Sequence, residues 1–527
     1  MKKIFQYLGR PFKNNFYFLL VLFLLIAFMD VAYSFVIGRW LWGIYLAFCN
    51  LLISYILTLL VDTFPSKWIR KGVQALILIP AILFFVIDVV CIGEFHFYFT
   101  MDAAGIIAGT NIMEAWEFMR MFLSVKLVLT ILGCFLVIIG TFCYNKKNKL
   151  RLGDKGVVLG LGGGVMIGIG LMMTIHGLWE RTIVGKIVSC VDAADIPELE
   201  LQHPLLQIIK ERQPDNIVLI IGESFSKSHS SLYHYSRDTN PYLSILRDSS
   251  LLFVYNNVAS PGLNTIESMK SVMSTYKPEY GDSISWYKCL SIPEMFNVLG
   301  YNTYWISNQS KTGAFDNIIT KYAELCQKDY FIGHKFSGLN KQDVDGLVIH
   351  RLFPLLATRT GKLNFYAIHL MGSHYYFDQR YPSQFGKYTE DDYLSFPPSQ
   401  RYNLATYDNS ILYNDSVVYQ VMNLFADKEA VVFYFSDHAL DVYDSSKDYV
   451  GHARINDSLS VKAGSAIPFM IYASPQYQEY FPAEMELIKS SVDKPFRTDD
   501  LLYTLMDIVG VKFGDNQDME KYSLFRK

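Results

Sequence analysis

Two strand-end motifs in the second half of this 527-residue chain carry side chains that could bind a metal ion. Glu223 follows the apolar run NIVLIIG within GES, and Asp437 and His438 close the run AVVFYF within FSDH. Zinc binds imidazole nitrogen and carboxylate oxygen in tetrahedral sites, and a catalytic site keeps one position for the reacting group. A carboxylate at each of two strand ends therefore favours a shared ion. For the Asp-His pair alone, the alternative is a capping aspartate beside a surface histidine.

A threonine in the segment SPGLNTIES could supply the hydroxyl for a group transfer. The Pro-Gly turn before Asn264 and Thr265, with Glu267 following, is typical of a helix start, at which Asn264 or Thr265 is simply the N-cap. A hydroxyl that touches zinc at a helix N-terminus is instead acidified, and the N–H groups there stabilise an anion. Both interpretations follow from the pattern. Together with His452, these side chains form the set that a zinc-assisted transfer onto threonine requires.

Six short apolar runs supply the strands that would position these side chains. They alternate with polar, helix-like segments, which favours an α/β domain with a largely parallel sheet covered on both faces. Sites in such sheets form at the carboxyl ends of strands, where Glu223, His369 and Asp437 fall. His369 lies inside its run, and we expect it to pack in the core. The six runs are NIVLIIG, LFVYNNV, NTYWIS, NFYAIHL, AVVFYFSD and PFMIYAS.

The first part of the chain predicts a membrane domain. A spanning helix needs roughly 20 mostly apolar residues, and five stretches reach that length. Five in succession argue against buried helices of a soluble core, and the first is too long for a cleaved signal peptide. Asp30 and Asp88 should face the bundle interior or a wet interface. The five stretches run from Phe16 to Ile37, Leu41 to Val61, Val73 to Ile92, Phe122 to Cys143 and Val157 to Ile175.

The basic residues of the short loops predict the orientation of these helices. Lys and Arg collect at the N-terminus and in the second and fourth loops, whereas the first and third loops carry one Arg each. This alternation places the N-terminus in the cytoplasm and everything after residue 176 outside it. We expect a five-helix transmembrane domain over residues 1–176, a connector, partly helical at the membrane surface, over 177–214, and the α/β domain over 215–527. A net charge of −3 argues against a general nucleic-acid binder.

Six blocks, in order along the chain, resemble the phosphoethanolamine transferases. These are five-helix membrane enzymes with an alkaline-phosphatase-like domain, and they include the mobile colistin-resistance enzymes. The opening block is GESFSKSHSSLYHYSRDTNPYLS, and NTIES matches the family pattern Thr-x-x-Ser. The match covers essentially the whole chain. The blocks that follow are WISNQSKTG, HLMGSHYYFDQRYP, TYDNSILYND and FSDH, with His452 after them.

The resemblance implies a zinc-dependent enzyme of the inner membrane with a periplasmic catalytic domain. It implies transfer of phosphoethanolamine from phosphatidylethanolamine to lipid A or the lipopolysaccharide core, with Thr265 as the acceptor in a covalent intermediate. One zinc is implied, and a second is left open. The implied zinc ligands are Glu223, Thr265, Asp437 and His438. Family positions that hold the phosphate or a second zinc are matched by Lys311, His374 and His452, and those that contact the lipid donor by Thr110 and Glu114.

The chain departs from the family pattern at several positions. Ala439 stands where the family has a glycine after the Asp-His pair, and Ile106 replaces an asparagine four residues before Thr110. Asp441 and Asp444 replace a Glu-rich segment, and the family's disulfide pattern is absent. None of these departures removes an implied ligand. Together they indicate a distant branch of the family, whose acceptor substrate can differ.

Two alternative functions remain from the sequence. One is a glycerol-phosphate transferase of the lipoteichoic acid synthase type, against which the RDTNP and GSH blocks argue. The other is a non-catalytic lipid-sensing protein of the same fold, which would be expected to lose the nucleophile or a ligand. A sulfatase is disfavoured because no Cys/Ser-x-Pro-x-Arg motif surrounds Thr265.

Overall fold

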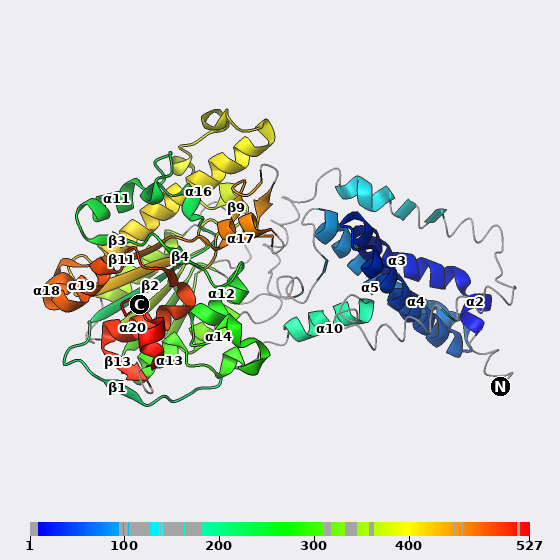
Figure 1. Cartoon of the computed structure of the whole chain (residues 1–527), viewed down its shortest axis with the longest axis horizontal. Helices are drawn as coiled ribbons and strands as arrows, with labels where there is room; N and C mark the ends of the chain where they lie inside the picture. Colours follow the sequence, from blue (N-terminus) through cyan, green and yellow to red (C-terminus); the bar gives the residue numbers. More distant parts are fainter. Residues whose placement is uncertain are drawn as a thin grey trace. The chain divides into compact units, whose positions relative to one another are not determined.

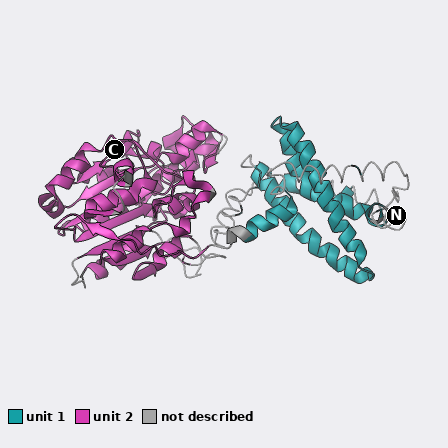
Figure 2. Cartoon of the chain, turned by 60° about the horizontal axis from the view of Figure 1, so that its bottom comes forward, with its two compact units in different colours: residues 1–195 teal, residues 196–527 magenta. Residues whose placement is uncertain are grey.

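The computed structural model forms two compact units, residues 1–195 and 196–527, which Figure 2 shows in different colours. Each unit has its own core of buried apolar side chains. The residues described are 9–93, 98–99, 104, 127–133, 135–136, 139–140, 163, 182–194, and 197–526 apart from 310, 312–317, 333–344, 358–362, 447–448, 455–456 and 514–516.

Three long apolar helices dominate the described part of the first unit (Figure 1), and each is long and apolar enough to cross a membrane. They confirm the first three predicted stretches, although the third helix begins earlier, at Lys67. The predicted stretch from Phe122 to Cys143 is described only as short helical pieces, and that from Val157 to Ile175 lies almost wholly outside the described residues. The helices of this unit are α2 (Arg10–Asn14), α3 (Phe16–Val36), α4 (Trp40–Thr63), α5 (Lys67–Gly93) and α10 (Ile183–Ala194).

A buried ion cluster joins three of these helices. Lys186 on α10 lies 3.0 Å from a carboxylate oxygen of Asp30 on α3 and 2.6 Å from one of Asp88 on α5. All three side chains are almost completely buried. The two aspartates therefore face the interior of the unit, as the sequence predicted. The Lys186 cation offsets the cost of burying their charges.

The second unit is built on a seven-stranded sheet of order β3-β11-β8-β2-β7-β5-β6. Five neighbouring strands, from β8 to β6, are mutually parallel, whereas β11 runs antiparallel to both β8 and β3. The strands of this sheet are β2 (Asn216–Gly222), β3 (Leu252–Val254), β5 (Asn302–Ser307), β6 (Lys328–Phe331), β7 (Asn364–His369), β8 (Ala430–Ser436) and β11 (Phe469–Ala473).

The predicted runs all form strands, but the sheet is mixed rather than uniformly parallel. The reason lies in the connection from β8 to β11, which leaves and re-enters the sheet at the carboxyl edge of β8. At this edge, the backbone N–H of Ser436 donates to the carbonyl oxygen of Pro468 at 3.4 Å. A chain that returns from the carboxyl edge must run antiparallel. Short two-stranded ladders pair β1 (Leu206–Ile208) with β13 (Val511–Phe513), β9 (Asp441–Val442) with β10 (Val450–Gly451), and β4 (Val258–Ala259) with β12 (Phe496–Arg497).

Helices cover both faces of the large sheet, as the alternation predicted (Figure 1). Alternate residues of β2, such as Ile217 and Ile221, join one core with α12, α13, α14 and α20, and α15 and α16 cover the opposite face. The helices are α11 (Pro241–Asp248), α12 (Thr265–Val272), α13 (Ile292–Val298), α14 (Ile318–Glu324), α15 (Leu347–Ala357), α16 (Pro398–Asn423), α17 (Ser458–Ser465), α18 (Pro475–Tyr480), α19 (Pro482–Ser490), α20 (Leu501–Val509) and α21 (Gln517–Tyr522).

Candidate active site

The pairing of β2 with β8 brings Glu223 next to the Asp-His pair. Gly222 and Ser436 are partners in parallel register, so the residues after them leave the sheet side by side. The backbone N–H of Asp437 donates to the carbonyl of Gly222 at 3.1 Å, which fixes this alignment. One ligand atom from each of Glu223, Asp437 and His438 lies within 4.8 Å of the others. All three side chains are buried.

Hydrogen bonds orient the ligand atoms of this group toward one another. His438 Nδ1 lies 3.0 Å from the carbonyl oxygen of Ala439, so Nε2 points to Glu223 Oε1 at 3.1 Å. Asp437 Oδ1 accepts hydrogen bonds from the backbone N–H groups of Ser224 and His438, at 3.2 and 2.7 Å. The other oxygen, Asp437 Oδ2, is buried and makes no hydrogen bond to the described residues.

Protons balance the charges of this group at pH 7, because its members shift one another's pKa values. Burial and the charge of Glu223 raise the pKa of Asp437 to about 8. Burial alone would lower the pKa of His438, but Asp437 and Glu223 raise it to about 9. Burial likewise opposes ionisation of Glu223, yet its hydrogen bond to His438 keeps the pKa of this carboxyl well below its usual range. Two buried carboxylates that share one imidazole are a donor set that fits a divalent cation.

Thr265 lies against this group, and a different residue caps its helix. The side chain of Asn264 accepts the backbone N–H of Glu267 at 3.0 Å, so the N-cap role belongs to Asn264. The hydroxyl of Thr265 donates to Glu223 Oε2 at 3.1 Å and lies 3.4 Å from His438 Nε2. The predicted helix start is confirmed, with Asn264 rather than Thr265 as its cap, and the Thr265 side chain is left to contact the group.

Two further histidines border the group. The rings of His452 and His438 are 4.8 Å apart, and His452 Nδ1 lies 3.2 Å from the carbonyl oxygen of Leu263. Burial lowers the pKa of His452 to about 3 and that of His374 to about 4. Both imidazoles are therefore neutral at pH 7, the form in which histidine accepts a proton or binds a metal.

The structure does not bring all the predicted site residues together. Lys311 forms ion pairs with Asp329 at 2.5 Å and Glu324 at 3.6 Å, on β6 and α14. Thr110 and Glu114 lie outside the described residues. His369 is buried in β7, with Nδ1 3.2 Å from the hydroxyl of Ser307, as expected for a packed histidine.

One contact of the site was missed by the sequence reasoning. The side-chain amide of Gln309 lies 3.4 Å from Glu223 Oε2 and donates to the carbonyl of Leu370 at 3.1 Å. Gln309 stands two residues before Lys311 in the same SNQSK block. The block thus contributes Gln309 to the surroundings of Glu223, whereas Lys311 forms its ion pairs with Asp329 and Glu324.

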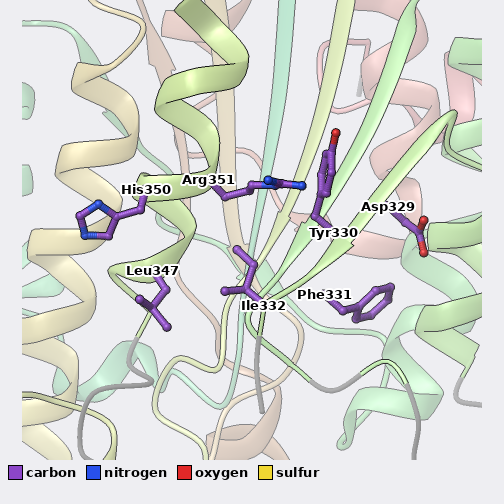
Figure 3. Close-up of a pocket in the computed structure, with 7 residues that line it drawn as sticks. All are labelled: Asp329, Tyr330, Phe331, Ile332, Leu347, His350 and Arg351. Atoms are coloured by element: carbon purple, nitrogen blue, oxygen red, sulfur yellow. The ribbon is translucent and has the colours of Figure 1, made fainter. Parts of the chain in front are cut away.

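A cavity of about 540 Å³ lies apart from this group, beside β6 and α15 (Figure 3). The Arg351 guanidinium lies 3.7 Å from the centre of the Tyr330 ring at one wall. None of the residues that line the cavity belongs to the predicted site, although Asp329 is the ion-pair partner of Lys311. The lining residues are Asp329, Tyr330, Phe331, Ile332, Leu347, His350 and Arg351.

Comparison with known proteins identifies relatives of this domain. A family model described as Sulfatase matches residues 215–511. Phosphoethanolamine transferase EptC of Escherichia coli strain K12 is 29% identical over 314 residues, which are 57% of this chain and 52% of EptC. Phosphoethanolamine transferase CptA of Salmonella typhimurium is 28% identical over 311 residues, again 57% of this chain and 52% of the relative. The chain thus spans about half the length of the curated relatives it matches.

Solved structures agree with these matches. The C-terminal periplasmic domain of Escherichia coli EptC, in complex with Zn, matches with a TM-score of 0.55 at 26% identity, over 63% of this chain and 90% of that domain. The integral membrane lipooligosaccharide phosphoethanolamine transferase A of Neisseria meningitidis matches with a TM-score of 0.67 at 17% identity, over 97% of this chain and 98% of that one. The second likeness concerns the fold alone. It supports a membrane domain joined to a sulfatase-like domain, without fixing the number of spanning helices. The resemblance noted in the sequence is confirmed.

Proposed function

This chain belongs to the sulfatase family, and we propose that it is a zinc-dependent membrane transferase that moves phosphoethanolamine from phosphatidylethanolamine to lipid A or the lipopolysaccharide core. The matched relatives EptC and CptA are named phosphoethanolamine transferases. Sulfate-ester chemistry is disfavoured because the motif expected around its nucleophile is absent at Thr265.

The position of the Thr265 hydroxyl is the observation that carries this proposal. It lies 3.1 Å from a carboxylate oxygen of Glu223 and 3.4 Å from His438 Nε2, the nitrogen that Asp437 Oδ2 approaches at 3.5 Å. A threonine hydroxyl is a weak nucleophile until a neighbouring group withdraws its proton or stabilises its alkoxide. Here the Glu223 carboxylate already accepts the hydrogen bond of that proton.

The first step joins Thr265 to the donor. Thr265 Oγ1 attacks the phosphorus of phosphatidylethanolamine, and the bond between that phosphorus and the diacylglycerol oxygen breaks. The hydroxyl proton passes to Glu223 Oε2, the carboxylate oxygen that accepts its hydrogen bond, and the departing diacylglycerol oxygen takes up a proton. The product is phosphoethanolamine esterified to Thr265.

The second step transfers phosphoethanolamine to the acceptor and regenerates the free threonine hydroxyl. A hydroxyl or phosphate oxygen of the acceptor attacks the same phosphorus, and the bond to Thr265 Oγ1 breaks. Thr265 recovers its proton, so one site serves donor and acceptor in turn. The neutral imidazole of His374 borders this position and can donate a hydrogen bond to a phosphoryl oxygen. His452, whose Nδ1 faces the carbonyl oxygen of Leu263, instead offers an unprotonated Nε2 that can accept a proton.

Glu223, Thr265, Asp437 and His438 would hold the zinc. A bound zinc would supply Lewis acidity, which favours the threonine alkoxide and offsets negative charge at the phosphoryl group. We place Thr110 and Glu114 at the lipid donor on the basis of the family pattern. We further propose that the catalytic domain is periplasmic and the N-terminus cytoplasmic, as the basic loops indicate.

The covalent intermediate tests this function directly. The purified full chain is incubated in detergent with phosphatidylethanolamine and no acceptor, and its peptides are examined by mass spectrometry. We expect one phosphoethanolamine group on Thr265 and release of diacylglycerol. Thr265→Val keeps the branched shape without the hydroxyl and should show neither, whereas Thr265→Ser should retain part of the reaction.

The same experiment separates the alternative functions. Phosphatidylglycerol in place of phosphatidylethanolamine would label Thr265 with glycerol phosphate if the chain were of the lipoteichoic acid synthase type. A lipid-sensing protein would label with neither donor. An adduct on another residue, or undiminished diacylglycerol release by Thr265→Val, would refute the assignment of Thr265.

A further inference from the structure

A buried aspartate outside the predicted site gathers three hydrogen bonds from two loops. Asp345 precedes α15, and its side chain is buried. It accepts the backbone N–H groups of Met371 and Gly372, each at 2.8 Å, and the side-chain amide of Asn308 at 2.9 Å. Asn308 follows β5, and Met371 and Gly372 follow β7. The carboxylate thus ties together the loops that leave two neighbouring parallel strands.

One of these loops sets the backbone of Glu223. Gly372 has a φ of +53°, and a Cβ atom placed on it would lie 2.6 Å from the carbonyl oxygen of Glu223. The next residue, Ser373, donates its backbone N–H to that same oxygen at 2.9 Å. A shift of this loop would therefore move the backbone of Glu223 with it.

The other loop touches the carboxylate end of Glu223. Gln309 is adjacent to Asn308, and its amide lies 3.4 Å from Glu223 Oε2. The same oxygen accepts the hydrogen bond of the Thr265 hydroxyl. Through these two loops Asp345 is connected to the backbone of Glu223 and to its carboxylate, although Asp345 itself belongs to neither loop.

The loop that follows β7, residues 371–375, is also held at its far end, by a residue other than Asp345. The buried guanidinium of Arg380 donates to the carbonyl oxygen of His374 at 3.2 Å and to that of Tyr375 at 2.8 Å. With Arg380 at one end and Asp345 at the other, the loop that carries His374 has both ends fixed. The beginning of the loop, which Asp345 holds, packs on the backbone of Glu223 through Gly372 and Ser373.

We propose that Asp345 is a positioning residue that fixes Glu223 for metal binding and for the hydrogen bond to Thr265, acting through Gly372 and Asn308. The inference rests on the proposed function. It requires no contact between Asp345 and the metal or substrate.

The charge of Asp345 matters because three donors converge on its two oxygens. An ionised carboxylate is acceptor-only, whereas the amide of asparagine has one acceptor oxygen and one NH₂ group. In Asp345→Asn, the NH₂ group must face at least one of the backbone N–H groups, which leaves a buried donor unsatisfied. The volume of the side chain is nearly unchanged, so packing is preserved while the loops lose their common anchor.

Asp415 offers a matched control. It is equally buried on α16, and it also accepts two consecutive backbone N–H groups and one asparagine amide: those of Tyr242, Leu243 and Asn240, at 2.7, 3.2 and 3.3 Å. These partners hold the start of α11 and belong to neither loop. Asp415→Asn therefore removes the same kind of anchor at a place that does not touch Glu223.

The test compares the two variants in the purified full chain. Zinc affinity is measured by competition with a chelator, and kcat and KM for phosphatidylethanolamine are measured on zinc-loaded protein. We expect Asp345→Asn to raise the zinc Kd about tenfold or more and to lower kcat with little change in KM. Asp415→Asn should leave the zinc Kd and kcat at their wild-type values, even if both variants lose thermal stability.

Each outcome decides the matter. Equal zinc affinity in Asp345→Asn and the wild type, or equal losses in the two variants, would overturn the positioning role. Wild-type protein that binds no zinc would instead refute the proposed function. If Asp345→Asn does not fold, Asn308→Ala replaces it, because this change removes one donor and keeps the carboxylate. A rise of about threefold in zinc Kd is then expected, and an unchanged Kd contradicts the inference.

Discussion

Zinc should bind this protein more tightly as the pH rises from 6.5 to 8.5. Without a metal, the imidazole of His438 carries a proton at neutral pH, because Asp437 and Glu223 raise its pKa to about 9 against the opposing effect of burial. The pKa of Asp437 is also raised, to about 8, by burial and by the charge of Glu223. Metal ligands must be deprotonated, so zinc has to displace these protons.

The size of the effect follows from the pKa of His438. One pH unit below a pKa corresponds to about 1.4 kcal/mol, or a factor of ten, for each proton displaced. At pH 7 the proton of His438, with a pKa of about 9, therefore weakens zinc binding roughly 100-fold relative to the deprotonated site. The raised pKa of Asp437 acts in the same direction. We expect the zinc Kd to fall at least about tenfold between pH 7 and pH 8.

The same protonation sets the stability of the metal-free protein. The pKa of His438 is about 9 in the fold, against an ordinary value of 6.5 for histidine. Its contribution to stability is therefore fully present below pH 6.5 and lost as the pH rises through about 9. The raised pKa of Asp437 likewise makes the metal-free fold less favourable as that carboxyl ionises. Zinc should consequently raise the melting temperature more at pH 8.5 than at pH 6.5.

The assay is a chelator competition at several pH values, corrected for protonation of the chelator, with proton release measured by calorimetry in two buffers. Between one and two protons should be released per zinc at pH 7. His234→Gln alters a histidine outside the Glu223–Asp437–His438 group and should keep the full pH dependence, whereas Asp437→Asn should reduce it. A zinc Kd that does not change between pH 6.5 and 8.5 would refute the charge arrangement.

Two further predictions concern the first unit. A reporter enzyme fused after residue 180 should be active only outside the cytoplasm, because the basic loops alternate across five expected spans; cytoplasmic activity would contradict the orientation. Lys186→Met should destabilise the membrane unit by about 3 kcal/mol or more, since it leaves Asp30 and Asp88 buried without their cation. Thermal unfolding in detergent measures this, with Lys71→Met, an exposed lysine of α5, as the control, and equal melting temperatures would contradict the role of Lys186.

The sequence predicted the strands of the site because their side chains are buried on both faces. Continuous apolar runs such as residues 216–222 and 430–436 became β2 and β8 over the same residues. Parallel strands end at a common edge, so the proximity of Glu223 and Asp437 could be inferred from their places in the chain. Edge strand β6 was missed, since its sequence KDYF is short and only partly apolar.

Contacts made between distant segments could not be predicted in this way. Lys311 was selected from its block, but its partners Asp329 and Glu324 lie on other elements of the fold. Asp345 shows no local signal, because its role depends on backbone groups 26 and 27 residues further along the chain. Whether Asn264 or Thr265 caps α12 depended on a rotamer, which the residue types do not specify.

The departures that follow the Asp-His pair fall on residues that make backbone or supporting contacts. The carbonyl oxygen of Ala439 faces His438 Nδ1, and its backbone N–H donates to the carbonyl oxygen of Gly464 at 2.8 Å. Both contacts use backbone atoms, so neither requires a glycine. Asp441 accepts the hydroxyl of Ser460 at 2.6 Å and the backbone N–H of Asp444 at 3.1 Å, which organises the segment after the Asp-His pair. Such contacts hold the loop without adding a side chain to the Glu223–Asp437–His438 group. The chain can therefore differ from its relatives around the site while it keeps the geometry on which the proposed chemistry depends.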